Sequence, residues 1–328
     1  MFTFHVPVHN LEMLHTNEVK HDRLIITRLR DHDTIIFNIR TYREYRPTAI
    51  ATINVPDNIQ VAADANEYVK NYIVPYQRLL SFAQDHDVRF VGSSWGKPIE
   101  QIEQEIKQVP SIGKITKWNS SVIVYSEVLN EFLDIAIPLL TNENYNAKTG
   151  LQRALIHYNT GYFLDAIETQ LAMYFVGLET ITNAYWDNLI ESETLSKTWL
   201  FEKETWSVLQ KSVRQKVDEL KIEDPSRGKF LNRFGNLKDP PIEEKIKALC
   251  NAYNLPDYSK EIALINEMRN DFLHDRKIEN TYGNLQYYEV VFCCQRLLAK
   301  MILKLLNFYH KHPKVHGAYT NDNLLAED

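Results

Sequence analysis

The chain has 328 residues, of which 44% are hydrophobic and 24% charged, and its formal net charge is −6 at pH 7. A length well above the usual domain size of roughly 100–150 residues predicts two domains, and the hydrophobic content is sufficient for a buried core. The acidic balance argues against a protein wrapped in nucleic acid over its whole surface. It leaves room for one local basic groove.

Cysteine usage and hydropathy predict a soluble, cytoplasmic protein. The cysteines are Cys250, Cys293 and Cys294, an odd number without CxxC spacing, which favours reduced and buried thiols. The first residues lack a basic start followed by an apolar run, so we expect no secretory signal. No stretch approaches the roughly 20 apolar residues of a membrane span, and we expect no membrane partner.

Short β-branched runs separated by polar turn residues predict antiparallel strands in the front half. The expected strands cover residues 23–29, 34–40, 48–55, 88–92 and 121–126. Helical spacing predicts helices over residues 66–84, interrupted by Pro75, and over residues 99–109. The front half is therefore expected to be a mixed α+β domain.

Two features of the front half have competing interpretations. Histidines at positions 5, 9, 15 and 21 could form a metal cluster, but their spacing matches no familiar ligand pattern, which favours solvated or capping histidines. The aromatic and basic run from Thr41 to Pro47 could stack on bases or hold a partner. It could equally be a strand end whose amphipathic side chains cover the sheet.

Residues 139–150 lose apolar periodicity and gather Asn, Thr and Gly, which predicts a domain boundary. We expect an α+β sensor or regulatory domain over residues 1–140 and an all-α domain over residues 150–315. Helical periods predict a helix over residues 151–181, either continuous or broken near Thr160 and Gly161. Further helices are expected over residues 196–220 and 242–253, from Ser259 onward, and over about 285–309, with a turn at 225–228.

The segment INEMRNDFLHDRK, residues 265–277, carries an arginine on the apolar sector of the helix that begins at Ser259. A guanidinium there must be paired or must face an interface or ligand, because an isolated buried charge is costly. The paired alternative has three candidate acids: Asp165, Glu168 and Glu179. His274 falls roughly 140° from Arg269 on a continuous helix, so the two converge only if the helix ends near Leu273 or if a second copy supplies one of them. His274 could instead bond the last carbonyls of the helix.

The last expected helix carries a basic stripe at four-residue steps, formed by Arg296, Lys300 and Lys304. Residues 296–314 contain no acidic side chain although the whole chain is acidic. The stripe is interpreted either as a track for the RNA phosphate backbone or as a solvated helix face.

The run Arg269-Asn270-Asp271-Phe272-Leu273-His274, near the end of a penultimate helix, resembles the R-x4-6-H motif of HEPN domains. QLAMYFVGLETI, residues 170–181, is similar to the first long helix of the Apea-like HEPN branch, in which a β-containing domain commonly precedes the HEPN domain. One departure is Arg276, which stands where HEPN toxins controlled by adenylylation carry a tyrosine.

The resemblance implies a HEPN-like helical bundle and metal-independent RNA cleavage at the interface of a homodimer, without a cofactor. Arg269, Asn270 and His274 would be catalytic, Glu179 would support them, and Arg276, Arg296, Lys300 and Lys304 would bind RNA. Such a protein would be a toxin or antiphage defence effector, with a phage or host protein as its trigger or an antitoxin as its inhibitor. The alternative is a non-catalytic HEPN-type module that binds RNA, a nucleotide or a protein. A third possibility, in which the front half is the active part, lacks a recognisable constellation of residues.

Overall fold

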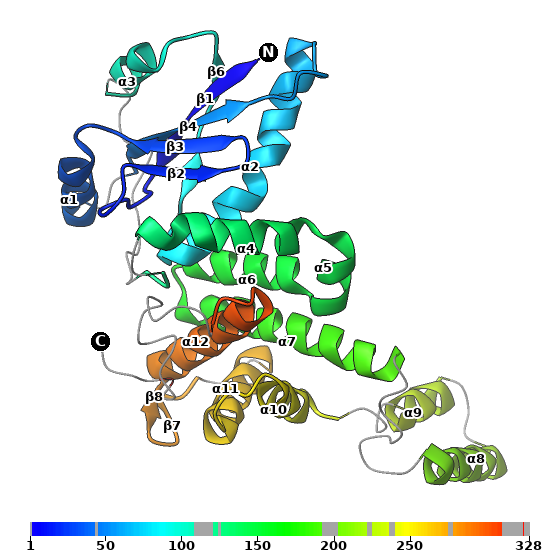
Figure 1. Cartoon of the computed structure of the whole chain (residues 1–328). Coiled ribbons are helices and arrows are strands. Elements are labelled where there is room, and N and C mark those ends of the chain that lie inside the picture. The colour runs from blue at the N-terminus through cyan, green and yellow to red at the C-terminus, as the bar shows by residue number, and fades with distance from the viewer. Residues whose placement is uncertain are drawn as a thin grey trace.

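In the computed structural model, a region with a small β-sheet is followed by a mostly helical region (Figure 1). The structure describes residues 2–42, 45–107, 121–123, 126–191, 203–221, 225–235, 240–274, 278–309 and 324. The order of α+β and helical regions agrees with the prediction, with a short hairpin added to the helical part. None of the described helices has the length and apolar composition needed to cross a bilayer.

The sheet is antiparallel, with strand order β2-β3-β4-β1-β5 and with β6 also paired to β1. Its strands are β1 (Thr3–His9), β2 (Glu18–His21), β3 (Leu24–Arg28), β4 (Pro47–Asn54), β5 (Arg89–Phe90) and β6 (Ser94–Trp95). The strands expected over residues 23–29, 48–55 and 88–92 are confirmed as β3, β4 and β5. β1 was not expected, because Pro7 and two histidines interrupt its apolar run, yet Phe4, Val6 and Val8 alternate into the core.

The helices of this region are α1 (His32–Tyr42), α2 (Ala62–Gln84) and α3 (Ile99–Lys107). The strand predicted over residues 34–40 is wrong, since these residues lie in α1. Ile36 and Ile39 are buried on one helical face while Phe37 is 67% exposed, so packing overrides the β-branched propensity. α2 continues through Pro75 instead of breaking there.

The strand expected over residues 121–126 is not formed in its described part. Ile123 makes a single bridge, and the short 3-10 helix η1 (Ser126–Val128) begins at the end of the expected strand. Residues 124 and 125 lie outside the described residues.

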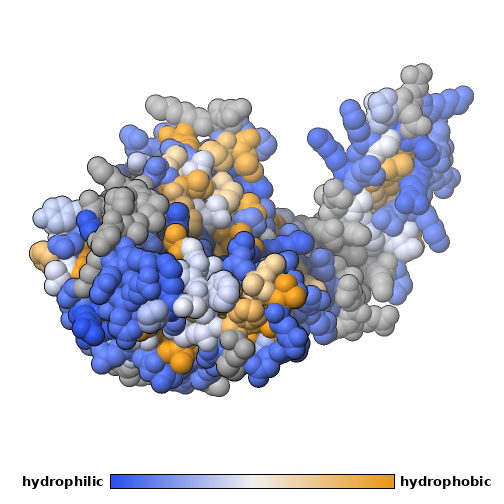
Figure 2. Space-filling view, turned by 90° about the horizontal axis from the view of Figure 1, so that it is seen from above, coloured by the Kyte–Doolittle hydropathy of each residue, from blue (hydrophilic) through white to orange (hydrophobic). Residues whose placement is uncertain are grey.

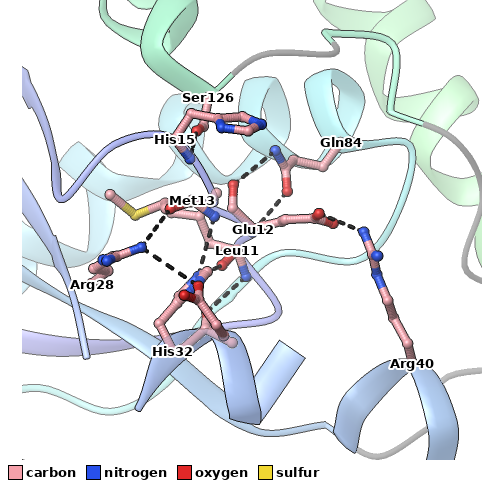
Figure 3. Close-up of polar contacts among 11 residues, drawn as sticks. Leu11, Glu12, Met13, His15, Arg28, His32, Arg40, Gln84 and Ser126 are labelled. Carbon is pink, nitrogen blue, oxygen red and sulfur yellow. Dashed lines mark hydrogen bonds and ion pairs between the residues drawn. The ribbon is translucent and has the colours of Figure 1, made fainter. Parts of the chain in front are cut away.

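The irregular segment after β1, residues 10–13, is buried, and side chains bind its backbone groups (Figure 3). Gln84, at the end of α2, accepts a hydrogen bond from the Glu12 N–H at 2.8 Å and donates one to the Glu12 carbonyl at 3.3 Å. His32 Nε2 accepts from the Met13 N–H at 3.1 Å. These bonds replace the lost sheet ladder and fasten α1 and α2 to the strand.

The second region consists of α4 (Leu129–Thr141), α5 (Glu143–Thr149), α6 (Leu151–Phe163), α7 (Ile167–Glu191), α8 (Lys203–Glu219), α9 (Ser226–Gly235), α10 (Ile242–Ala252), α11 (Ser259–Leu273), the hairpin β7 (Thr281–Tyr282) and β8 (Leu285–Gln286), and α12 (Tyr287–Leu305). Of the two alternatives for residues 151–181, the structure has the pair, α6 and α7. The break lies at residues 164–166, a few residues after the position expected near Thr160 and Gly161. The turn predicted at 225–228 is wrong, because Pro225 immediately precedes α9 and its fixed φ suits a helix start.

α8 and α9 stand beyond the end of α7, apart from the main body (Figure 1). Trp206 of α8 stacks on Phe234 of α9 with ring centroids 5.2 Å apart. The surface of this arm is mainly hydrophilic when viewed from above (Figure 2). The expected helix over residues 196–220 corresponds to α8, and residues 196–202 lie outside the described residues.

Residues 139–150, the predicted boundary, are helical for most of their length. Asn142 Oδ1 accepts from the Tyr145 N–H at 2.9 Å and caps α5, and Gly150 turns the chain into α6 with φ 68°. One core cluster contains residues from β1 through α12, on both sides of this corner. The division at residues 140–150 therefore stays a prediction.

Candidate functional site

Arg269 lies where α11 packs beside α7. Ile262, Ile265 and Met268 bury the apolar face of α11, and the Arg269 side chain is 26% exposed at the edge of that face. Its Nη2 donates to Glu179 Oε1 at 3.1 Å, which makes an ion pair between α11 and α7. Of the acids considered from the sequence, Glu179 is thus the partner.

Two further contacts fix the guanidinium. Arg269 Nη1 donates to Asn270 Oδ1 at 3.1 Å, and Arg269 Cζ lies 5.0 Å from the centroid of the Phe175 ring. A cation over an aromatic face contributes about 0.5–1 kcal/mol at a partly exposed position. Since the Glu179 side chain is 28% exposed, the pair is also only partly desolvated, and part of the arginine's donor fork remains open to solvent.

His274 is the residue at which α11 ends. Its backbone N–H donates to the Asn270 carbonyl at 3.1 Å, and its side chain is exposed. Among the described residues, no hydrogen bond or ion pair joins His274 to Arg269, and none involves the His274 ring. The structure therefore brings Arg269, Asn270 and Glu179 together and leaves His274 outside this cluster, one residue beyond the helix.

A small pocket of about 90 Å³ lies beside Arg269. Its walls are mostly apolar and come from α7 and α11, with Phe272 and Leu273 on the α11 side. Leu273 is 52% exposed at the rim. A volume of this size holds a few water molecules but no nucleotide, so a ligand could reach Arg269 only from the open surface.

A much larger groove of about 1110 Å³ shares Val176 and Glu179 with this pocket. It is bounded by α2, the α4–α5 corner, α6 and α7, and it includes Arg78 and Arg153. Sequence reasoning missed both arginines, because neither belongs to a motif and only the packing of α2 against α6 brings them to one groove.

The predicted basic stripe on the last helix is corrected by the structure. Lys300 is completely buried between the rings of Tyr258 and Tyr309, each 5.9 Å from its ammonium nitrogen. Lys304 is 9% exposed with its nitrogen 4.3 Å from the Tyr309 ring centroid, and burial lowers its pKa. α12 is covered on nearly all sides, so neither lysine can contact an RNA backbone in this arrangement.

The other two residues predicted to bind RNA are Arg296 and Arg276. Arg296 Nη1 donates to the carbonyl of Leu324 at 2.9 Å, so it binds the chain's own C-terminal segment. Arg276 lies within residues 275–277, outside the described residues.

Neither the histidines nor the cysteines gather into a reactive centre in the described part of the chain. No group of three His, Cys, Asp or Glu side chains there could hold a metal ion. His5 Nδ1 lies 3.0 Å from Thr52 Oγ1, and His21 Nδ1 lies 2.7 Å from Tyr76 Oη, so each has its own partner. The predicted free, buried thiols are confirmed, and burial raises the pKa of Cys250 and of Cys293 to about 12, which makes them poor nucleophiles.

No protein-family model, curated protein or solved structure matches this chain. The resemblance to HEPN domains thus rests on the short segments in α7 and α11, and its functional implications stay a proposal.

Proposed function

We propose that this protein is a metal-independent endoribonuclease of the HEPN type, acting in the cytoplasm as a toxin or antiphage effector. The observation that supports it best is the fixed guanidinium of Arg269, held between Glu179, Asn270 and Phe175 with a quarter of its side chain open to solvent. A preorganised donor fork of this kind suits a phosphate on which charge develops.

The reaction would be an attack of the RNA 2′-hydroxyl on the adjacent phosphorus. The 2′-oxygen loses its proton and forms the new P–O bond, the bond to the 5′-oxygen breaks, and that oxygen gains a proton. The products are a 2′,3′-cyclic phosphate and a 5′-hydroxyl. His274 would move one of these protons, because imidazole can exchange protons near neutral pH.

The proposed active form is a homodimer with a composite site. Within one chain His274 is not bonded to Arg269, and the exposed Leu273 beside the small apolar pocket offers a surface for a second copy. The histidine of one copy would then face the arginine of the other. The front α+β region would restrain the nuclease or receive its trigger.

The first experiment is cleavage of RNA in EDTA by the purified protein. We expect Arg269→Ala and His274→Ala each to lower the cleavage rate by at least about 100-fold, in line with the loss of a proton-transfer group or an oxyanion donor. Glu179→Gln is expected to lower kcat while leaving KM nearly unchanged, because it positions Arg269 without touching RNA. Glu267→Gln, an exposed position of the same helix, is the matched control. Folded variants of Arg269 and His274 that cut as fast as the parent would refute the site.

Mixing the two inactive variants tests the composite arrangement. If arginine and histidine come from different copies, a mixed dimer of Arg269→Ala and His274→Ala contains one intact site of two. Up to about a quarter of the parental activity should return in an equal mixture. No recovery, in a mixture shown to exchange subunits, would place both residues of a working site in the same copy.

A second candidate function is a non-catalytic module that binds RNA, a nucleotide or a protein. It is favoured by the Arg269–Glu179 pair, which by itself accounts for an arginine on this helix face. This candidate predicts binding without turnover, and binding that survives loss of His274.

A further inference from the structure

The groove between the sheet region and the helical bundle has the size and lining of a ligand site. Its volume of about 1110 Å³ slightly exceeds the roughly 300–1,000 Å³ typical of small-molecule pockets, which suits an extended ligand. Along α7 it follows one helical face from Val176 to Asp187, a length of about 16 Å at 1.5 Å per residue. Asparagine and threonine side chains on several of its walls make it polar.

Arg78 of α2 is partly buried in this groove, and burial lowers its pKa. No acidic side chain in the described part of the chain forms an ion pair with it. The Asn159 side chain donates to the Arg78 carbonyl at 3.0 Å, which fixes this point of α2 against α6. The backbone at Arg78 is therefore held in place, and its guanidinium is partly desolvated and has no carboxylate partner among the described residues, a combination that an anionic ligand would stabilise.

Arg153 of α6 adds a second cation from the neighbouring wall. It too lacks a carboxylate partner among the described residues. Burial, and then the charge of Arg153, lower the pKa of His157 one turn further along α6, so this charge is felt locally. The groove therefore has a basic part where α2 and α6 meet.

The acidic side chains that line the groove lie on α5 and α7 and not on α2 or α6, which carry the two arginines. Glu179 is paired with Arg269, Glu143 belongs to α5, and Asp187 lies near the end of α7. The Asn188 side chain donates to the Lys148 carbonyl at 2.5 Å, which places the Asp187 end of the groove at the C-terminal end of α5. Along α7, Asp187 is about 12 Å beyond Glu179.

We propose that this groove binds a phosphate-bearing ligand, an RNA phosphodiester or the phosphate of a free nucleotide, with Arg78 and Arg153 as the residues that contact the anion. This inference concerns binding and goes beyond the proposed cleavage. If the ligand is RNA, the strand would pass from the groove to Arg269 over Val176, which lines both the groove and the small pocket.

The test is equilibrium binding of a labelled single-stranded RNA to the full chain in EDTA, in the His274→Ala background so that the probe stays intact. We expect Arg78→Gln and Arg153→Gln each to raise the Kd about tenfold, the effect of losing one charge-assisted hydrogen bond. Arg78→Lys should restore part of the affinity, because it keeps the charge. Arg214→Gln, at an exposed arginine on α8 outside the groove, should change Kd by less than about twofold.

Unlabelled ATP distinguishes the two sources of phosphate. If ATP displaces the RNA, and both groove variants lose affinity for ATP as they do for RNA, the groove is assigned to free nucleotides. If ATP does not compete, the groove is assigned to the RNA strand. The proposal is overturned if Arg153→Gln and Arg78→Gln both bind with the affinity of the parent. It is also overturned if the parent binds neither the RNA nor ATP. Because Arg153 is exposed, its variant is not expected to unfold, which keeps the test decisive if Arg78→Gln fails to fold.

The result is separable from the nuclease hypothesis. RNA cleavage with unchanged affinity in both groove variants would overturn the groove alone. Loss of binding in the groove variants of a parent that never cleaves RNA would overturn the nuclease alone.

Discussion

Two buried histidines make the stability of the fold depend on pH. Burial, followed by the charge of Arg89, lowers the pKa of His9 to about 4, and burial lowers that of His86 to about 4. An unfolded histidine titrates near pH 6.5. Between about pH 6.5 and about pH 4 the unfolded chain therefore binds more protons than the folded chain, and the free energy of unfolding falls as the pH falls.

His9→Gln should make the protein less sensitive to acid. Removing one such histidine takes away up to about 3 kcal/mol of pH-dependent loss, since each pKa unit corresponds to about 1.4 kcal/mol. The measurement is the free energy of urea unfolding from about pH 7 to about pH 4.5 in parent and variant. Any packing change caused by the glutamine shifts the whole curve, so the slope against pH is the readout. Identical slopes in parent and variant would mean that His9 has the same pKa in the folded and in the unfolded chain.

Arg269 shows how much of the environment of a single residue can be predicted from the sequence. Its place on the apolar sector predicted a partner, and the Glu179 pair supplies one. The sequence could not select Glu179 over Glu168 or Asp165, because that choice depends on how α7 and the connection before it pack against α11. It also offered no way to link Arg78 to Arg153, which lie on helices far apart in the chain.

At the scale of elements, close helix contacts depend on glycine. An added Cβ at Gly161 of α6 would lie 2.6 Å from Cε1 of Tyr174, whose side chain is 1% exposed and has little room to move. Gly228 of α9 has nothing within 4 Å of the corresponding position. Both glycines lie in helices, so a comparison of alanine substitutions at the two positions separates the effect of packing from that of helix propensity.

Gly161→Ala should destabilise the protein by about 1–3 kcal/mol through overpacking. Gly228→Ala should be neutral or stabilising by up to about 1 kcal/mol, because alanine is the better helix former and meets no neighbour. Urea unfolding of both variants beside the parent measures the difference. A stabilised Gly161→Ala would show that Tyr174 can yield and that the α6–α7 contact is loosely packed.

The elements that periodicity predicted well are those with one covered face, such as α6 and α10. Periodicity failed where packing against neighbouring elements decides the secondary structure or the exposure of a helix face. Residues 34–40 were expected as a strand from Ile35 and Ile36, but they form a helix whose buried side chains pack beside the sheet. On α12 the stripe of Lys300 and Lys304 looked solvent-facing, since a helix pattern does not reveal that other elements cover the face that carries these two lysines.

At the scale of the whole molecule, the sheet region and the helical bundle meet at Asp85. This residue ends α2, and its carboxylate accepts hydrogen bonds from Tyr158 of α6 at 2.7 Å and from Gln295 of α12 at 3.2 Å. All three side chains are buried within the continuous core. Such a shared polar joint couples the stability of the two regions.

Tyr158→Phe tests this coupling, because it removes one donor to a buried carboxylate and leaves the aromatic ring. We expect a loss of about 1.5–3 kcal/mol, the usual value of a hydrogen bond to a charged group. Native-state hydrogen exchange, followed on peptides from β4 and from α12, localises the effect. If the chain unfolds as one unit, the slowest-exchanging amides of both peptides lose the same free energy of protection. A loss confined to α12 would instead show that the sheet region keeps its own stability, and would support two separate domains.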